Sequence, residues 1–577
     1  MQKDIKELLE FIYGAEEGRE ASARLETLIE GWVKRIKPPF SRKAGRLPMD
    51  ETDAFLITYG DQFRREGSCP LQCLKEFLDS NLMGFISGVH ILPFFPYSSD
   101  DGFSVIDYKE VNPDLGTWDQ IREIGLNFKL AADLVLNHCS VKSEWFKKFL
   151  QGDERFKDYF ITVDPATDLS MIVRPRARPL LTRFETDKGE IYVWTTFSED
   201  QVDLNYANPD VLIALIEILL FYIEKGIQII RLDAIAYLWK EIGHPSIHHP
   251  KTHAVVKLVR SIVNHYTPWV VILTETNVPH RENISYFGDG TDEAHMVYNF
   301  SLPPLVLHAF LREKTSYLQE WASSLTSPGS ETAFFNFLAS HDGIGVLPAQ
   351  GILPADEIDF LIEQVKARGG YVSYKSAPSG EIPYELNISY RDAVAESYLD
   401  KERRAKKFLA SQAVMLSFKG VPGIYMHSLL GSGNYREGVE KTGVKRAINR
   451  EKLDYQKTIE ELNTSGSIRN LIFKGFLRLL GARSKQKAFH PAGKQKVIPC
   501  SGSVFGLLRS SPDEKERLFC FINTGSRVRN VSIPSSGSIG GVLKDIISDN
   551  IVRIKDSGDK KELKINPYEV LWLKEMD

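Results

Sequence analysis

The chain has 577 residues, of which 43% are hydrophobic and 26% charged, and its formal net charge is −4 with a pI near 6.4. This composition is typical of a globular protein with more than one domain, and the charge gives no reason to expect a nucleic acid or an anionic membrane as a partner. The five cysteines are few and scattered, and the pair Cys69 and Cys73 lacks a second Cys/His pair that would complete a zinc site. Residues 1–13 carry charges throughout, unlike a secretory signal, and the most apolar run, residues 211–223, is too short to span a bilayer. We therefore expect a cytoplasmic protein.

Residues 1–50 are expected to form a helical extension. Apolar residues such as Ile5, Leu9 and Ile12 recur at helical spacing up to about residue 36. Pro38, Pro39 and the basic stretch 42–46 then break the pattern, which indicates a linker.

The segment 51–484 is expected to be a (β/α)8 barrel of the TIM type, an α/β fold. Short apolar runs alternate there with longer amphipathic segments, which is typical of βαβ units and a parallel sheet. Eight such runs are expected to be its strands: residues 54–58, 88–92, 130–136, 227–232, 270–274, 296–299, 333–338 and 423–425.

Two stretches are too long for ordinary loops of a barrel. Residues 145–208 are expected to form an inserted domain after the third strand, and residues 345–391 an inserted loop domain after the seventh. Both leave the carboxyl ends of strands, where barrel active sites are built. Residues 485–577 alternate β-rich segments with Gly, Ser and Pro turns, which predicts a small antiparallel C-terminal domain.

Four of the expected strands end in polar sequences that contain carboxylates. Charged groups at the ends of apolar strands are costly to desolvate unless they are paired or used. One such residue alone would be read as a helix cap, but four at separate strand ends indicate a catalytic site. The sequences are Asp133–His138, Arg231–Ala234, Thr274–Asn277 and Ser340–Asp342.

Two of these carboxylates suit the cleavage of a glycosidic bond, which needs one ionised and one protonated carboxyl group. Arg231 precedes Asp233 by two residues and so shares its face of the strand, where it would hold Asp233 ionised as a nucleophile. Glu275 follows an apolar strand, and desolvation would raise its pKa as a general acid requires. His138 and His341 could donate hydrogen bonds to sugar hydroxyls.

These four segments resemble the signature regions of glycoside hydrolase family 13, the α-amylase family. The resemblance implies Asp233 as nucleophile, Glu275 as general acid/base and Asp342 as the stabiliser of the transition state. It also places Arg231, His138 and His341 around the sugar.

Longer stretches of residues 53–480 resemble the sucrose phosphorylase branch of that family. They include 90–108, 201–205, 300–304, 339–345 and 448–450. The resemblance implies that the sugar is bound by Asp100, Phe103, Gln201 and Arg450, with Arg446 as an alternative to Arg450. It also implies that Tyr384 and Glu385 belong to a loop that binds the acceptor and phosphate in turn.

A phosphorylase must hold phosphate beside the sugar, and the fork of an arginine suits an anion. The run Arg174, Arg176 and Arg178 lies in the first insertion, and the branch pattern favours Arg174 or Arg176 as the phosphate and acceptor site. Glu385 stands where sucrose phosphorylases carry Gln, and a carboxylate there disfavours the sucrose assignment.

Three features resemble the glucosylglycerate phosphorylases of this branch: the N-terminal extension around residues 10–14, residues 292–298 and the histidine-rich loop 247–253. We therefore expect phosphorolysis of 2-O-α-glucosylglycerate to α-glucose 1-phosphate and glycerate, with phosphate as co-substrate and no cofactor or metal. Sucrose, sucrose 6-phosphate or glucosylglycerol phosphorylase remain alternatives, as do an α-glucoside hydrolase and a non-catalytic barrel. An amylase-type calcium through Asn137 also stays open, as does a monomer or a homodimer.

Overall fold

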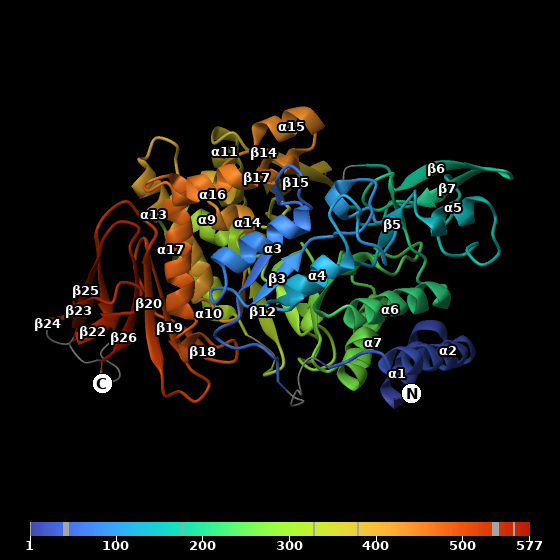
Figure 1. The fold of residues 1–577 in the computed structure, drawn as a ribbon, viewed down its shortest axis with the longest axis horizontal. Coiled ribbons are helices and arrows are strands. Elements are labelled where there is room, and N and C mark those ends of the chain that lie inside the picture. The colour runs from blue at the N-terminus through green and yellow to red at the C-terminus, as the bar shows by residue number, and fades with distance from the viewer. Residues whose placement is uncertain are drawn as a thin grey trace.

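The computed structural model describes residues 2–38, 46–175, 178–326, 329–377, 380–533, 542–557 and 560–576. Its centre is a closed barrel of eight parallel strands, and successive strands along the chain are neighbours around it (Figure 1). The prediction of a (β/α)8 barrel is thereby confirmed. The strands are β1 (Phe55–Thr58), β3 (Gly88–Ile91), β4 (Lys129–Val135), β9 (Ile227–Asp233), β10 (Val271–Thr274), β11 (Met296–Tyr298), β12 (Ala333–Asn336) and β16 (Val421–Tyr425).

Aromatic rings fill the barrel next to glycines. Phe55 and Phe335 meet edge to face with 6.2 Å between ring centroids. A Cβ atom on Gly88 would lie 2.2 Å from the ring of Phe55, and one on Gly423 would lie 2.4 Å from the ring of Phe335. The glycines therefore make the space that these rings occupy. The main helices around the barrel are α3 (Pro70–Asn81), α4 (Trp118–Gly125), α6 (Pro209–Glu224), α7 (Pro250–Tyr266), α9 (Leu302–Arg312), α10 (Ser316–Ser324), α13 (Lys401–Ser417) and α17 (Ile468–Arg483).

The N-terminal segment forms a hairpin of two helices, α1 (Lys3–Tyr13) and α2 (Ala15–Val33), beside α6 and α7 (Figure 1). The chain turns at Gly14, whose φ of 87° favours glycine. A Cβ atom on Gly18 would lie 2.6 Å from the backbone of Glu10, so the two helices approach closely at this point. Pro39 and residues 42–45 of the expected linker lie outside the described residues.

Two insertions leave the barrel where the sequence indicated. The first lies between β4 and β9 and contains β5 (His138–Ser140), α5 (Glu144–Leu150), β6 (Leu181–Thr186), β7 (Gly189–Trp194) and β8 (Gln201–Asp203). The second follows β12 and contains β13 (Ile344–Gly345), α11 (Ala355–Ala367), β14 (Tyr371–Ala377) and β15 (Gly380–Asn387). The first insertion lies at the upper right of Figure 1, far from the C-terminal strands.

The C-terminal segment forms antiparallel sheets, as expected from its alternating pattern. A six-stranded sheet runs in the order β18-β19-β20-β26-β22-β23, and a three-stranded sheet in the order β21-β25-β24. The limits of the whole segments as domains remain predictions. The strands are β18 (Lys494–Val497), β19 (Val504–Ser510), β20 (Arg517–Asn523), β21 (Arg529–Ile533), β22 (Val542–Asp545), β23 (Ile551–Arg553), β24 (Lys555–Ser557), β25 (Lys560–Ile565) and β26 (Val570–Glu575).

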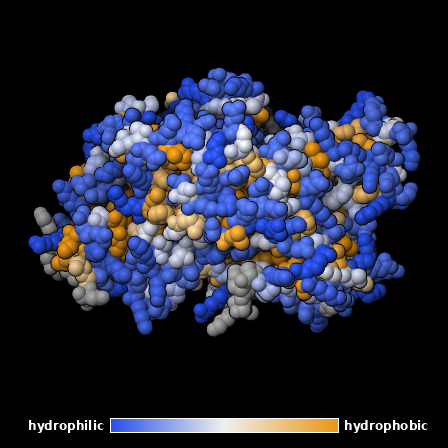
Figure 2. Space-filling view, in the orientation of Figure 1, coloured by the Kyte–Doolittle hydropathy of each residue, from blue (hydrophilic) through white to orange (hydrophobic). Residues whose placement is uncertain are grey.

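The face of the molecule shown in Figure 2 is mainly hydrophilic, with small, separate apolar areas. Within the described ranges, no helix combines the length and the apolar character needed to cross a bilayer. All five cysteines are free thiols.

Candidate active site

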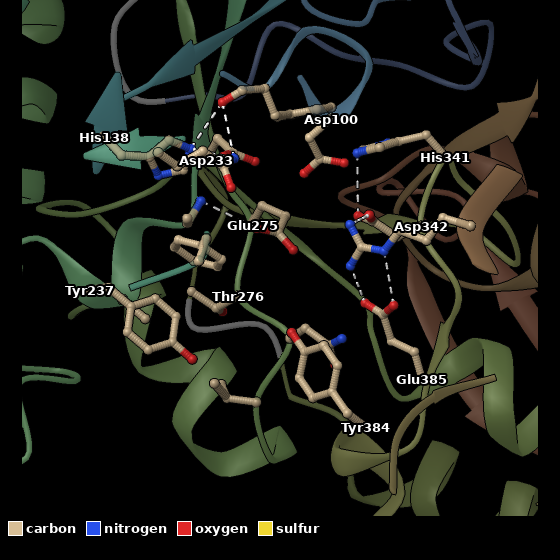
Figure 3. Close-up of a pocket in the computed structure, with 18 residues that line it drawn as sticks. Asp100, His138, Asp233, Tyr237, Glu275, Thr276, His341, Asp342, Tyr384 and Glu385 are labelled. Carbon is tan, nitrogen blue, oxygen red and sulfur yellow. Dashed lines mark hydrogen bonds and ion pairs between the residues drawn. The ribbon is translucent and has the colours of Figure 1, made fainter. Parts of the chain in front are cut away.

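The carboxylates expected at the strand ends meet in one pocket (Figure 3). Asp233 ends β9, Glu275 follows β10, and Asp342 lies in the loop after β12. Parallel strands of a barrel present their carboxyl ends on one face, which brings these distant segments together. The pocket is lined by Asp100, Phe103, His138, Phe197, Gln201, Asp233, Ala234, Ala236, Tyr237, Glu275, Thr276, Asn277, Val278, His341, Asp342, Tyr384, Glu385 and Arg446.

Arg231 is buried among three carboxylates next to this pocket. Its Nη1 contacts a carboxylate oxygen of Asp133 and lies 2.7 Å from Oδ1 of Asp233. Its Nη2 lies 3.8 Å from Oε2 of Glu275. Arg231 and Asp233 therefore share one face of β9, as their spacing predicted.

The unequal distances to Arg231 distinguish the two facing carboxyl groups. Burial raises the pKa of both Asp233 and Glu275, and Arg231 opposes the rise in each case. The two groups interact and titrate together. Arg231 lies closer to Asp233 than to Glu275, and this geometry favours the negative charge on Asp233 and the proton on Glu275. A nucleophile and a general acid need this division.

Asp342 lies against cations from another part of the pocket. Nη1 of Arg446 is 2.5 Å from its Oδ1 and Nη2 of Arg450 is 3.7 Å from the same atom, while Nε2 of the His341 ring lies 3.3 Å from its Oδ2. Burial alone would raise the pKa of Asp342, but Arg446 and the other nearby cations outweigh burial and hold that pKa below its usual value. Asp342 is therefore an ionised group suited to stabilising positive charge on a sugar.

The turn that carries Asp100 has a strained backbone. Asp100 and Asp101 have φ values of 52° and 50°, and residues held in this region cluster at functional sites. A Cβ atom on Gly102 would lie 2.5 Å from the carbonyl oxygen of Pro93. Arg450 Nη1 lies 3.4 Å from Asp100 Oδ1 and 2.9 Å from Asp101 Oδ2. Thus Arg450 is the arginine beside Asp100.

Phe103, His341, His138 and Gln201 form a connected wall. The rings of Phe103 and His341 stack with centroids 4.5 Å apart. Nε2 of His138 lies 3.0 Å from the carbonyl oxygen of Phe103 and 3.1 Å from Nε2 of Gln201. Burial lowers the pKa of His138, and it lowers that of His341 to about 3. Both rings are therefore neutral near pH 7.

The second insertion supplies Tyr384 and Glu385 to the pocket lining. Glu385 is 1% exposed, and both of its carboxylate oxygens bind Arg446, at 3.0 Å to Nε and 2.5 Å to Nη2. The unfavourable carboxylate noted in the sequence is therefore paired with a guanidinium group.

Of the expected phosphate-binding arginines, the structure describes Arg174, which is not among the residues that line the pocket. Arg174 directs Nη1 towards the carbonyl oxygen of Arg178, 3.5 Å away, and Arg176 lies outside the described residues. Arg178 instead lines a cleft of about 540 Å³ that shares Asp100, Phe197, Gln201 and Arg446 with the pocket.

Sequence reasoning did not single out four residues of the lining: Phe197, Ala236, Tyr237 and Val278. Tyr237 lies four residues after Asp233, and Val278 three residues after Glu275. Their position next to the catalytic strand ends was the available signal.

A buried lysine occupies the place where calcium was considered. Nζ of Lys240 lies 2.6 Å from Oδ1 of Asn137 and 2.8 Å from Oδ2 of Asp203. The ammonium group thus already contacts both of these oxygen atoms and compensates the charge of Asp203. Across the part of the chain that the structure describes, no cluster of His, Cys, Asp and Glu suits a metal ion.

Comparison with known proteins places this geometry in a family. Residues 81–346 match the model of the α-amylase catalytic domain. The chain is 59% identical to a glucosylglycerate phosphorylase of Spirochaeta thermophila, over 99% of this chain and 98% of that protein. It is 43% identical to a glucosylglycerate phosphorylase of Escherichia coli, with both chains fully covered.

The fold is similar to the crystal structure of a sucrose 6F-phosphate phosphorylase from Thermoanaerobacter thermosaccharolyticum. The TM-score is 0.73 at 25% identity, over 89% of this chain and 98% of that one. With the full-length identities, this similarity shows that the chain belongs to the α-amylase family, glycoside hydrolase family 13, in its sucrose-phosphorylase-like branch of glycoside phosphorylases.

Proposed function

We propose that the protein is a retaining phosphorylase that converts 2-O-α-glucosylglycerate and phosphate into α-glucose 1-phosphate and glycerate. The observation that carries the proposal is the 59% identity to a glucosylglycerate phosphorylase over 99% of this chain. The arrangement of Asp233, Glu275 and Asp342 in one pocket supplies the chemistry that such a reaction needs.

The first half-reaction forms a covalent glucosyl-enzyme. Asp233 attacks the anomeric carbon while Glu275 gives its proton to the glycerate oxygen that leaves. Asp342 faces the positive charge that develops on the sugar. Arg231, whose Nη1 lies 2.7 Å from Oδ1 of Asp233, stabilises the ionised form of this nucleophile.

The second half-reaction transfers the glucosyl group to phosphate. A phosphate oxygen attacks the anomeric carbon, the bond to Asp233 breaks, and the phosphate proton returns to Glu275. Two inversions retain the α configuration. In this proposal the glucose site is formed by Asp100, Arg450, His138, Phe103, His341 and Gln201, and the contacts between these residues support it.

Binding of two anionic partners needs cations near an acidic pocket. Five carboxylates line the pocket, whereas Arg446 is the single Lys or Arg among its described lining residues. The adjoining cleft adds Arg178, Lys445 and Arg450. We therefore favour Arg178 over Arg174, which lines neither cavity, for binding phosphate and the glycerate carboxylate, and Arg176 stays a candidate.

The reverse reaction tests the choice of acceptor. From α-glucose 1-phosphate, phosphate release should be faster with glycerate than with fructose, fructose 6-phosphate or glycerol. A preference for fructose would assign the chain to the sucrose phosphorylases instead. Release of free glucose at a rate that no acceptor changes would indicate a hydrolase.

The proposal requires no resident cofactor, and phosphate serves as co-substrate. It also places the reaction in the cytoplasm, and the free thiols of the five cysteines fit a reducing compartment. The partners are then small molecules, and the state of association, monomer or homodimer, is a matter for measurement in solution.

A further inference from the structure

Glu385 belongs to the wall of the pocket, and both of its carboxylate oxygens already accept a hydrogen bond from Arg446. It lies in β15 with 1% of its surface exposed. Its Oε2 accepts a hydrogen bond from Nε of Arg446 at 3.0 Å, and its Oε1 accepts one from Nη2 at 2.5 Å. Such a two-point contact fixes the plane of a guanidinium group.

Arg446 also contacts Asp342. The guanidinium belongs to the short helix η5 (Lys445–Asn449), and its Nη1 lies 2.5 Å from Oδ1 of Asp342. Figure 3 shows the resulting row, in which one guanidinium group stands between Glu385 and Asp342. Three segments that are distant in the sequence thus meet through side-chain charges.

The backbone supports the same arrangement independently. Strand β15 pairs with β13, with Gly345 opposite Glu385, and β13 begins two residues after Asp342. A Cβ atom on Gly343 would lie 3.0 Å from Cβ of Glu385, so the strand passes directly against the loop of Asp342. Glu385 is therefore held at a fixed place relative to that loop.

We propose that Glu385 is a positioning residue for glucosyl transfer: it fixes Arg446, and Arg446 in turn fixes the carboxylate of Asp342 towards the sugar. The inference rests on the proposed function, in which Asp342 stabilises the transition state. A glutamine at position 385 would keep the shape of the side chain but would lose the charge and one of the two acceptor oxygens.

Two alternatives make different predictions. If Glu385 bound the acceptor directly, its loss would affect glycerate and phosphate but not the formation of the glucosyl-enzyme. If Glu385 only stabilised the fold, the effect of its substitution on the rate of glucosyl-enzyme formation would not depend on which residue occupies position 446. A measurement of glucosyl-enzyme formation in a double-mutant cycle separates these roles.

The experiment follows the first turnover of α-glucosyl fluoride, in which fluoride release reports formation of the glucosyl-enzyme before phosphate or glycerate is needed. Glu385→Gln should lower the rate of fluoride release roughly tenfold or more, as expected for a lost charged hydrogen bond, and should change the KM for the fluoride little. In an Arg446→Lys background, Glu385→Gln should lower the logarithm of the rate of fluoride release by less than half as much as it does in the parent. The matched control is Glu381→Gln, which changes an exposed carboxylate of the same strand.

Fluoride release by Glu385→Gln within threefold of the parent would overturn the inference, and so would an equal loss in both backgrounds. Should Glu385→Gln fail to fold, Glu385→Asp, which withdraws the carboxylate by one methylene group, replaces it in the cycle with the same two outcomes. A parent enzyme without activity on α-glucosyl fluoride or α-glucose 1-phosphate would contradict the proposed function itself. If the parent is active but the effects of the substitutions at positions 385 and 446 simply add, only the positioning role of Glu385 is contradicted.

Discussion

Replacing Arg178 by Ala should weaken phosphate and glycerate together. Arg178 lines the cleft that opens beside the pocket, whereas Arg174, four residues earlier in the same loop, lines neither cavity. A hydrogen bond to a charged group contributes about 1.5–3 kcal/mol, or roughly 10- to 150-fold in affinity. Because the side chain of Arg178 is exposed to water, we expect the lower end of that range, about tenfold.

The assay is the KM for phosphate in phosphorolysis and the KM for glycerate in the reverse reaction. Both should rise about tenfold in Arg178→Ala, whereas glycerol, which has no carboxylate, should be affected little. Arg174→Ala is the matched control and should stay within twofold of the parent. A normal KM for both anions in Arg178→Ala would refute the reasoning, and a large effect of Arg174→Ala would return the role to Arg174.

Three further variants test the pocket and its support. Asp233→Asn should lose most activity while keeping the Tm, and should form no covalent adduct with α-glucosyl fluoride; activity within tenfold of the parent would exclude Asp233 as nucleophile. Burial raises the pKa of Glu275, so the group keeps its proton to a higher pH than usual, and donor cleavage should fall as the pH rises through that pKa. Glu275→Gln should abolish this alkaline limb and should slow glucosylglycerate far more than α-glucosyl fluoride, since fluoride needs little protonation; equal losses on both would contradict the assignment. Lys240→Met leaves the carboxylate of Asp203 buried without its cation, which costs about 3–5 kcal/mol. The Tm should fall clearly below that of the exposed control Lys441→Met, and equal values would show that the ammonium group contributes little.

The barrel and the meeting of the carboxylates at its strand ends could be predicted because they depend on local patterns. Short apolar runs mark the strands. Where such a run ends in a carboxylate, that group must lie at the carboxyl end of the barrel, the face on which barrel enzymes carry their active sites. Asp233 and Glu275 therefore needed no knowledge of long-range contacts. The helical character of the N-terminal extension was also indicated by the spacing of its apolar residues, but the turn at Gly14 that makes it a hairpin was not.

Other features depend on contacts between segments that are far apart in the chain, and the sequence alone does not show which of these segments meet. The carboxylate of Glu385 looked unfavourable because its partner Arg446 lies 61 positions away in the chain. Which arginine of the loop near residue 176 faces the cleft depends on how the first insertion folds over the barrel, and spacing along the chain does not contain that information. The lysine between Asn137 and Asp203 likewise joins three separate segments.

The most direct test of the central claim follows 2-O-α-glucosylglycerate and phosphate by NMR in the presence of the enzyme. The account predicts α-glucose 1-phosphate and glycerate in equal amounts, with a rate that depends on phosphate. Free glucose formed at the same rate with or without phosphate, or a β-configured sugar phosphate, would contradict it.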